Sequence, residues 1–151
     1  MTMEKLRAEM TAFFQKLYVD QQKVLVFGEG PLHARLMMIG EAPGEQESLL
    51  GRPFVGKAGK NLDEFLALSG LKRAELYITN TVKYRPVKQS AAGNTVNRAP
   101  TQEEIKLGLP FLKREIALVA PEVIVTLGNV PLRALMGRSA TIGVLHGQWQ
   151  T

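Results

Sequence analysis

Cysteine is absent from the 151 residues of the sequence. This absence excludes disulfide bonds, thiolate metal sites, iron–sulfur ligation by cysteine and a cysteine nucleophile. The two histidines, His33 and His146, are isolated and lack the spacing of metal ligands, so we assign neither a catalytic role and predict no metal site. Apolar runs of about 20 residues, which a membrane-spanning helix requires, are also missing. Because the charged N-terminus does not resemble a secretory signal, we expect a cytoplasmic protein with no membrane partner.

The remaining composition is that of an ordinary globular protein. Hydrophobic residues make up 45% and charged residues 22% of the chain, and the length fits one domain over residues 1–151. The 19 Lys and Arg residues exceed the 14 Asp and Glu residues, which gives a formal net charge of +5. A basic balance favours a polyanionic partner only weakly, and a solvated basic surface explains it equally well.

Strand-like and helix-like stretches alternate along the chain, which predicts βαβ units and a short central parallel sheet between helices, a three-layer α/β/α sandwich. Apolar, β-branched stretches predict strands at residues 24–27, 36–39, 76–82, 123–127 and 144–149. Helical spacing of apolar residues predicts helices over residues 4–19, 55–70, 101–119 and 132–136. Thr101 and Glu104 form a capping-box pattern, and Pro110 should kink the helix that follows. Residues 86–100 are polar and predict a long loop.

Candidate binding residues follow the predicted strands. In doubly wound sheets, ligands bind where the parallel strands end. The turn after the first core strand contains Gly40, Ala42 and Gly44, where a small or absent side chain lets a ligand approach the backbone, and the carboxylates of Glu41 and Glu47. A plain strand-to-loop turn with solvated acids explains the same residues.

Two further side chains are unusual for their positions. Asn80 interrupts the β-branched stretch at residues 76–82, although Asn is depleted in strands, so it either braces a neighbouring loop or binds a ligand through its amide. Phe54 lies on a loop flanked by Gly and Pro, and is either a core residue or a stacking surface for a flat ring. Basic residues near these positions suit the backbone phosphates of a nucleic acid, or else form a solvated face; they are Lys57, Lys60, Lys83, Arg85 and Arg98.

Five motifs occur in the order GEAPGEQE, GRPFVGKAG, LYITNTVKYRP, NRAPTQEEI and APEVIVTLGNVP. Together they resemble the uracil-DNA glycosylase superfamily, close to its family 4 or iron–sulfur branch, over residues 24–149. The resemblance implies the three-layer fold and a DNA repair enzyme of base excision. Such an enzyme binds DNA that contains uracil, flips the base out of the helix and hydrolyses its N-glycosidic bond.

The resemblance also assigns roles to single residues. Glu41 corresponds to an acid that positions or activates water, Phe54 to the aromatic ring that stacks on the flipped base, and Asn80 to the amide that pairs with the uracil edge. It further implies that the base is bordered by the backbone of Gly40, Glu41 and Ala42 and by the carboxylate of Glu47. These roles are physically consistent, because an Asn amide matches the adjacent O4 acceptor and N3–H donor of uracil.

Two features depart from the family pattern. The positions of the four cluster cysteines hold Phe13, Lys16, Tyr84 and Gly108, so no cluster can form through cysteine and we expect no cofactor, with packing in its structural role. The sequence also ends before the C-terminal His-Pro motif of the family. We therefore expect either a fragment of a longer protein or a member of the family without this motif. An inactive chain is compatible with both expectations.

Two alternatives to a glycosylase remain open at the level of sequence. The first is a non-catalytic member of the same fold that binds nucleic acid or a nucleobase. The second is a nucleotide-binding α/β domain unrelated to repair, which the order of the five motifs disfavours. The sequence leaves the oligomeric state and the preference for single- or double-stranded DNA undetermined.

Overall fold

The computed structural model describes residues 1–137. Its elements, in chain order, are α1 (Met3–Leu17), β1 (Leu36–Gly40), α2 (Glu45–Leu50), α3 (Lys57–Ser69), a 3₁₀ turn (Arg73–Glu75), β2 (Tyr77–Asn80), β3 (Val87–Gln89), β4 (Thr95–Asn97), α4 (Gln102–Val119), β5 (Val123–Thr126) and α5 (Asn129–Met136). The strand predicted at residues 144–149 and the residue His146 lie outside the described residues.

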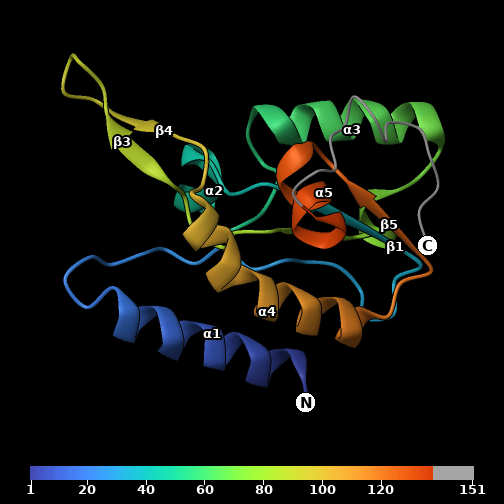
Figure 1. Ribbon diagram of the computed structural model, residues 1–151. Helices are drawn as coiled ribbons and strands as arrows, with labels where there is room; N and C mark the ends of the chain where they lie inside the picture. The colour runs from blue at the N-terminus through green and yellow to red at the C-terminus, as the bar shows by residue number, and fades with distance from the viewer. Residues whose placement is uncertain (138–151) are drawn as a thin grey trace.

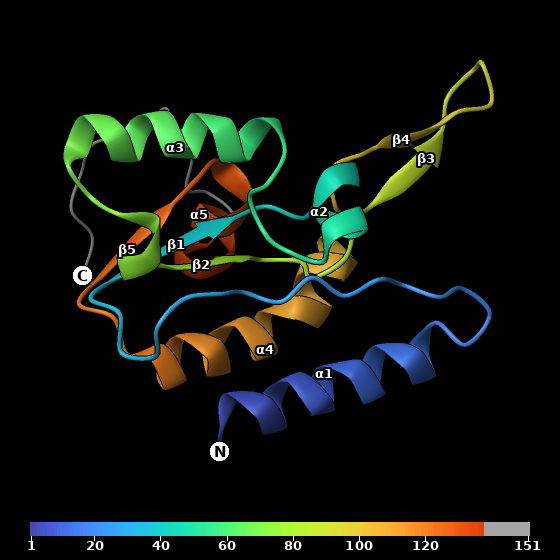
Figure 2. The same ribbon diagram turned by 180° about the vertical axis from the view of Figure 1, so that it is seen from behind.

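The predicted three-layer α/β/α arrangement is confirmed (Figure 1). The central sheet is parallel, with the strand order β2-β1-β5. Helix α3 lies on one side of this sheet, and α4 lies on the other, with α1 beyond it (Figures 1 and 2). Within residues 1–137, no helix is both long enough and apolar enough to cross a membrane.

The alternation of side chains along β1 explains why both faces of the sheet are covered. Met37 and Ile39 point into the core formed with α1 and α4, whereas Met38 packs with Leu62 and Leu66 of α3. Successive side chains of a strand point to opposite faces, so a strand between two helical layers must be apolar throughout. The continuous run LMMIG meets this requirement.

The prediction of a strand at residues 24–27 is wrong, because this segment forms no regular ladder with another strand. Val26 N donates to Lys83 O at 2.6 Å, and Glu29 forms an isolated antiparallel bridge with Ile78. Val24 is exposed. Residues 24–29 thus make separate backbone hydrogen bonds with Ile78 of β2 and with Lys83 after it, and they form no continuous strand pairing.

The loop predicted at residues 86–100 contains an antiparallel hairpin, in which β3 pairs with β4. Gly93 (φ +84°) lies in its turn, where a positive φ favours glycine. The hairpin projects from the body of the protein near α2 (Figure 2). Because neither of its faces covers the core, its strands do not need the apolar pattern from which strands are predicted.

The predicted capping box of α4 is confirmed. Glu104 N donates to Thr101 Oγ1 at 3.1 Å, and Thr101 N donates to Glu104 Oε1 at 2.8 Å. Arg98 Nη1 donates to the same carboxylate at 2.6 Å, and the Tyr84 hydroxyl donates at 3.1 Å. The helix continues unbroken through Pro110.

We expect Glu104→Gln to lower the free energy of unfolding at pH 7 by about 2 kcal/mol, the scale of hydrogen bonds to a charged group. Burial alone raises the pKa of this carboxyl, but the hydrogen bonds from Arg98, Thr101 and Tyr84 outweigh it and lower the pKa to about 2. A depressed pKa stabilises the fold above the unfolded-state pKa, and this stabilisation disappears as the pH falls from about 4.3 towards 2. Urea unfolding across this pH range measures the effect.

The matched control is Glu103→Gln, which removes an exposed carboxylate from the same helical turn. The control should unfold nearly as the unsubstituted protein does at every pH. A difference between Glu104→Gln and the unsubstituted protein that persists undiminished at pH 2 would contradict the assigned cause.

Candidate functional site

A cavity of about 360 Å³ lies where β1 and β2 end. It is lined by Ala42, Gly44, Glu45, Gln46, Glu47, Phe54, Gly56, Lys57, Ala58, Asn80 and Asn97. The structure therefore brings together, around one cavity, six residues that the sequence singled out. These six residues are Ala42, Gly44, Glu47, Phe54, Lys57 and Asn80.

Gly40 lies beneath this cavity, between the aromatic ring and the amide. A Cβ atom on Gly40 would be 2.5 Å from Phe54 Cζ and 2.6 Å from Asn80 Oδ1, closer than side-chain atoms can approach. The glycine is therefore required so that Phe54 and Asn80 can approach the end of β1 from two sides. The sequence predicted close backbone approach here, and the structure supplies the neighbours that approach.

Phe54 is fixed in a backbone conformation that non-glycine residues rarely adopt, with φ +54°. Arg73 holds it by donating from Nη1 to Phe54 O at 2.7 Å and from Nη2 to Pro53 O at 2.6 Å. Gly59 packs so close that a Cβ there would be 2.1 Å from Phe54 O. A strained residue held from several sides is typical of a preorganised site.

Glu47 braces the same loop through its carboxylate. Oε1 accepts from Gly44 N at 2.9 Å, and Oε2 accepts from Val55 N at 2.9 Å and from Gly56 N at 2.6 Å. Burial by itself raises the pKa of Glu47, but these backbone N–H groups outweigh it and hold the pKa below its usual range. Glu47 therefore lines the cavity as a carboxylate whose oxygens already bind the protein.

Asn80 is 4% exposed at the end of β2. Its backbone oxygen accepts a hydrogen bond from Lys83 Nζ. Within residues 1–137, the structure shows no protein partner for its side-chain amide. A buried amide beside a cavity is available to a ligand, whereas the bracing role considered from the sequence requires a protein partner.

The prediction that Lys83 contacts DNA phosphates is wrong. Its side chain is 1% exposed, and Nζ donates to Glu115 Oε1 and to Thr79 Oγ1, each at 2.8 Å. The Tyr77 hydroxyl donates to Glu115 Oε2 at 2.7 Å, and burial raises the pKa of Tyr77 so that this hydroxyl keeps its proton. Lys83 therefore belongs to a buried network below the site and cannot reach a ligand outside it.

The other predicted basic residues differ in what they bind. Lys57 and Lys60 are exposed at the start of α3. Arg85 Nε donates to Asn97 Oδ1 at 2.6 Å. Arg98 is bound to Glu104 and to the backbone oxygen of Val87. Of the five, Lys57 and Lys60 are those whose ammonium groups face solvent near the cavity.

Glu41 lies beside the cavity and does not line it. Its backbone continues the ladder between β1 and β2, since Thr81 N donates to Gly40 O at 2.9 Å and Val82 N donates to Glu41 O at 3.0 Å. The Glu41 side chain is exposed, although the surrounding protein displaces enough water to raise its pKa. The structure thus brings the Phe54 ring and the Asn80 amide together in the cavity, and it places the Glu41 carboxylate beside the cavity.

Several lining residues were missed from the sequence. Asn97 ends β4 and comes from the hairpin that the sequence described only as a polar loop. Without the register of β3 and β4, no pattern indicates which hairpin residue reaches the cavity. Gln46 is a further lining residue in α2, which is short and was predicted only as a turn.

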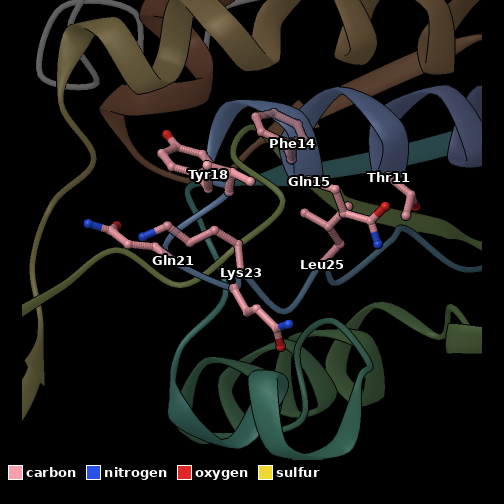
Figure 3. A pocket seen from close by; sticks show the side chains of 9 residues that line it. Thr11, Phe14, Gln15, Tyr18, Gln21, Lys23 and Leu25 are labelled. Atoms are coloured by element: carbon pink, nitrogen blue, oxygen red, sulfur yellow. The ribbon is translucent and has the colours of Figure 1, made fainter.

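A second hollow lies between α1 and the segment that follows it (Figure 3). Phe14, Tyr18 and Lys23 line it, and none of the predicted site residues does. Lys23 Nζ lies 4.9 Å from the centroid of the Tyr18 ring and 5.3 Å from that of Tyr84. This hollow adjoins an aromatic cluster and is separate from the site above.

The residues at the four expected cysteine positions do not fit an iron–sulfur cluster. Phe13 packs edge-on against Phe14 and Phe111, and Tyr84 packs edge-on against Phe14. The Tyr18 and Tyr84 hydroxyl oxygens are 2.7 Å apart. Residues 1–137 contain no group of three or more His, Cys, Asp or Glu side chains able to hold a metal ion. Aromatic packing joins α1, Tyr84 and α4 here, as expected from the sequence.

Comparisons with known proteins identify the family of the chain. The family model of the uracil DNA glycosylase superfamily matches residues 27–150. The chain is 42% identical over 115 residues to a type-4 uracil-DNA glycosylase of Pyrobaculum aerophilum, covering 76% of this chain and 55% of the relative. It is 41% identical over 132 residues to the type-4 enzyme of Thermotoga maritima, covering 87% of this chain and 64% of the relative.

A third relative, the type-4 uracil-DNA glycosylase of Archaeoglobus fulgidus, is 46% identical over 102 residues, which are 68% of this chain and 47% of the relative. The chain thus spans between about half and two thirds of the length of these relatives. The residues that match the family model, 27–150, include the strand ends and loops that build the cavity. This chain belongs to the uracil DNA glycosylase superfamily.

Proposed function

We propose that the protein removes uracil from DNA by hydrolysing its N-glycosidic bond, and that the cavity at the ends of β1 and β2 receives the flipped base. The observation that carries this proposal is the convergence of the Phe54 ring and the Asn80 amide on Gly40. A planar base that carries an adjacent acceptor and donor can stack on Phe54 and hydrogen-bond with Asn80 at the same time. Names of the relatives, which are uracil-DNA glycosylases, support the same substrate.

Each group in the cavity then has a physical task. Phe54 stacks on the base, and such stacking offsets about 1–3 kcal/mol of the cost of flipping. Asn80 donates to O4 and accepts from N3–H, while cytosine presents the opposite order of groups. The backbone of Gly40, Glu41 and Ala42 borders the base, and Glu47 keeps this loop in place.

Glu41 is the acid of the proposed reaction. Cleavage of the bond places positive charge on the sugar, which a nearby carboxylate stabilises, and the same carboxylate orients the attacking water. Because desolvation raises the pKa of Glu41, its carboxylate form is lost at a higher pH than for a solvated glutamate. Lys57 and Lys60 are proposed to bind DNA phosphates beside the cavity. The proposed place of action is the cytoplasm.

A second candidate function is binding of uracil-containing DNA without base release. The observation that favours it is the position of Glu41, which lies beside the cavity and does not line it. Binding without release predicts that affinity for DNA falls steeply with salt while the DNA stays intact.

The two functions separate in one experiment on the protein made from its complete reading frame. We expect the protein to release uracil from a labelled oligonucleotide, so that alkali cuts the strand at the resulting abasic site. Glu41→Gln should bind the same oligonucleotide but release uracil from it far more slowly, because it lacks the carboxylate that stabilises the developing charge. Strands that stay intact after alkali, while strands treated with a control glycosylase are cut by it, would reject the enzyme in favour of the binding protein.

A further inference from the structure

Asn97 brings the hairpin into contact with the cavity. It is the last residue of β4, and it lines the cavity together with Phe54 and Asn80. The rest of the hairpin projects away from the body of the protein (Figure 2). The cavity therefore has one wall whose position depends on the hairpin.

The orientation of the Asn97 amide follows from its partner. Arg85 Nε donates to Asn97 Oδ1 at 2.6 Å. Arginine has donors only, so the amide oxygen must face Arg85 and the amide nitrogen must face the other way. Asn97 Nδ2 lies 3.4 Å from the position that a Cβ on Gly44 would take. The nitrogen thus faces the turn that borders the cavity.

Arg85 also ties the hairpin to α2. Its Nη2 atom is 4.0 Å from Glu45 Oε2 at the start of that helix. Glu45, Arg85 and Asn97 thereby form a continuous polar contact along the rim of the cavity. Residues 85–98 include three basic residues and no acidic one, and two of the three, Arg85 and Arg98, pair with Glu45 and Glu104. The hairpin itself therefore carries no carboxylate that would repel an oxygen of a ligand.

We propose that Asn97 is a substrate-binding residue, whose Nδ2 donates a hydrogen bond to an oxygen of the flipped nucleotide. That oxygen belongs to the base or to the adjoining phosphate, both of which are acceptors. The inference rests on the proposed function, because it takes the cavity as the site of the flipped nucleotide. It adds the hairpin to the groups that bind the substrate.

Asn97→Asp tests the donor separately from the structural contact. An aspartate has the same shape and keeps, or strengthens, the bond from Arg85, so the hairpin stays in place. It loses the N–H donor and presents an oxygen to the ligand oxygen. The matched control is Asn94→Asp, which adds the same charge at the exposed turn of the same hairpin.

Affinity is measured for three labelled oligonucleotides of one sequence: one with a 2′-fluoro deoxyuridine analogue that resists cleavage, one with a tetrahydrofuran abasic site and one with thymidine. We expect Asn97→Asp to weaken binding of the uracil oligonucleotide about 10-fold more than Asn94→Asp does, the effect of one ligand hydrogen bond replaced by repulsion. Loss for uracil alone assigns the bond to the base, and equal loss for the abasic oligonucleotide assigns it to phosphate.

Equal affinities of Asn97→Asp and Asn94→Asp for the uracil and abasic oligonucleotides would overturn the inference. Failure of the proposed function has a different signature. In that case the unsubstituted protein binds the uracil and thymidine oligonucleotides equally well.

Discussion

Replacing Asn80 by Ala or Asp is expected to reduce uracil excision by about 10²- to 10³-fold, the scale found for loss of one preorganised donor at a reacting group. The amide is buried at the floor of the cavity, and Gly40 lies against its oxygen. Alanine removes both the donor to O4 and the acceptor from N3–H. Aspartate keeps the shape and the acceptor but has no donor. Single-turnover excision from a uracil oligonucleotide measures the loss.

Asn94→Asp is the control for the added charge, because Asn94 lies in the exposed turn of the hairpin. Folding is checked by thermal unfolding, since a buried amide also affects stability. Excision by Asn80→Ala within about threefold of the unsubstituted protein would contradict base pairing by Asn80, because that change falls well short of the loss expected for one donor.

The parts of the fold that depend on residues close together in the sequence were predictable from the sequence. The capping box of α4 was predicted because Thr101 and Glu104 interact three positions apart. The three strands of the sheet were predicted because apolar, β-branched runs are typical of strands in a parallel sheet covered by helices, as β1 shows most fully. The hairpin was missed, because a two-stranded sheet that covers no core needs no apolar pattern.

The chemistry of the site was predictable only in part. Phe54 and Asn80 were singled out because each is unusual at its position, and Gly40 because a glycine at a strand end permits close approach to the backbone; the structure brings the three together. The burial of Lys83 was not predictable, because it depends on Glu115, which lies on α4 and is 32 positions away. A lysine next to an arginine and a tyrosine otherwise indicates a solvated basic face. The strained φ of Phe54 likewise depends on Arg73, 19 positions away.

The network of Lys83 and Glu115 connects the stability of the fold to the position of Asn80. Lys83 Nζ binds Glu115 and the backbone oxygen of Asn80, so the same ammonium group neutralises a buried carboxylate and holds the end of β2. Glu115 is in turn bound by Tyr77 and Thr79 of the same strand. The side chains of Tyr77, Thr79, Lys83 and Glu115 thereby satisfy one another, and loss of one removes a hydrogen bond from each group that it contacts.

We expect Lys83→Met to lower the free energy of unfolding by about 3–5 kcal/mol, because it leaves the Glu115 carboxylate buried and unpaired. In a domain of this size, that corresponds to a fall in Tm of roughly 6–20 °C. The double variant Lys83→Met/Glu115→Gln should be more stable than Lys83→Met, since the neutral amide removes the unpaired charge and still accepts from Tyr77. Thermal and urea unfolding of the single and double variants measure this coupling.

The exposed ion pair of Arg35 and Glu122 provides the matched comparison for this buried pair. Its side chains are 84% and 63% exposed, whereas those of Lys83 and Glu115 are 1% and 2% exposed. Arg35→Met should cost at most about 1 kcal/mol, because water screens the exposed pair and solvates the carboxylate that remains. If Lys83→Met costs no more than Arg35→Met, or if the double variant is less stable than Lys83→Met, then the charge of Glu115 is not what makes Lys83 necessary. Asn80 would then be held by the β1–β2 ladder alone, and the ion pair would play no part in shaping the cavity.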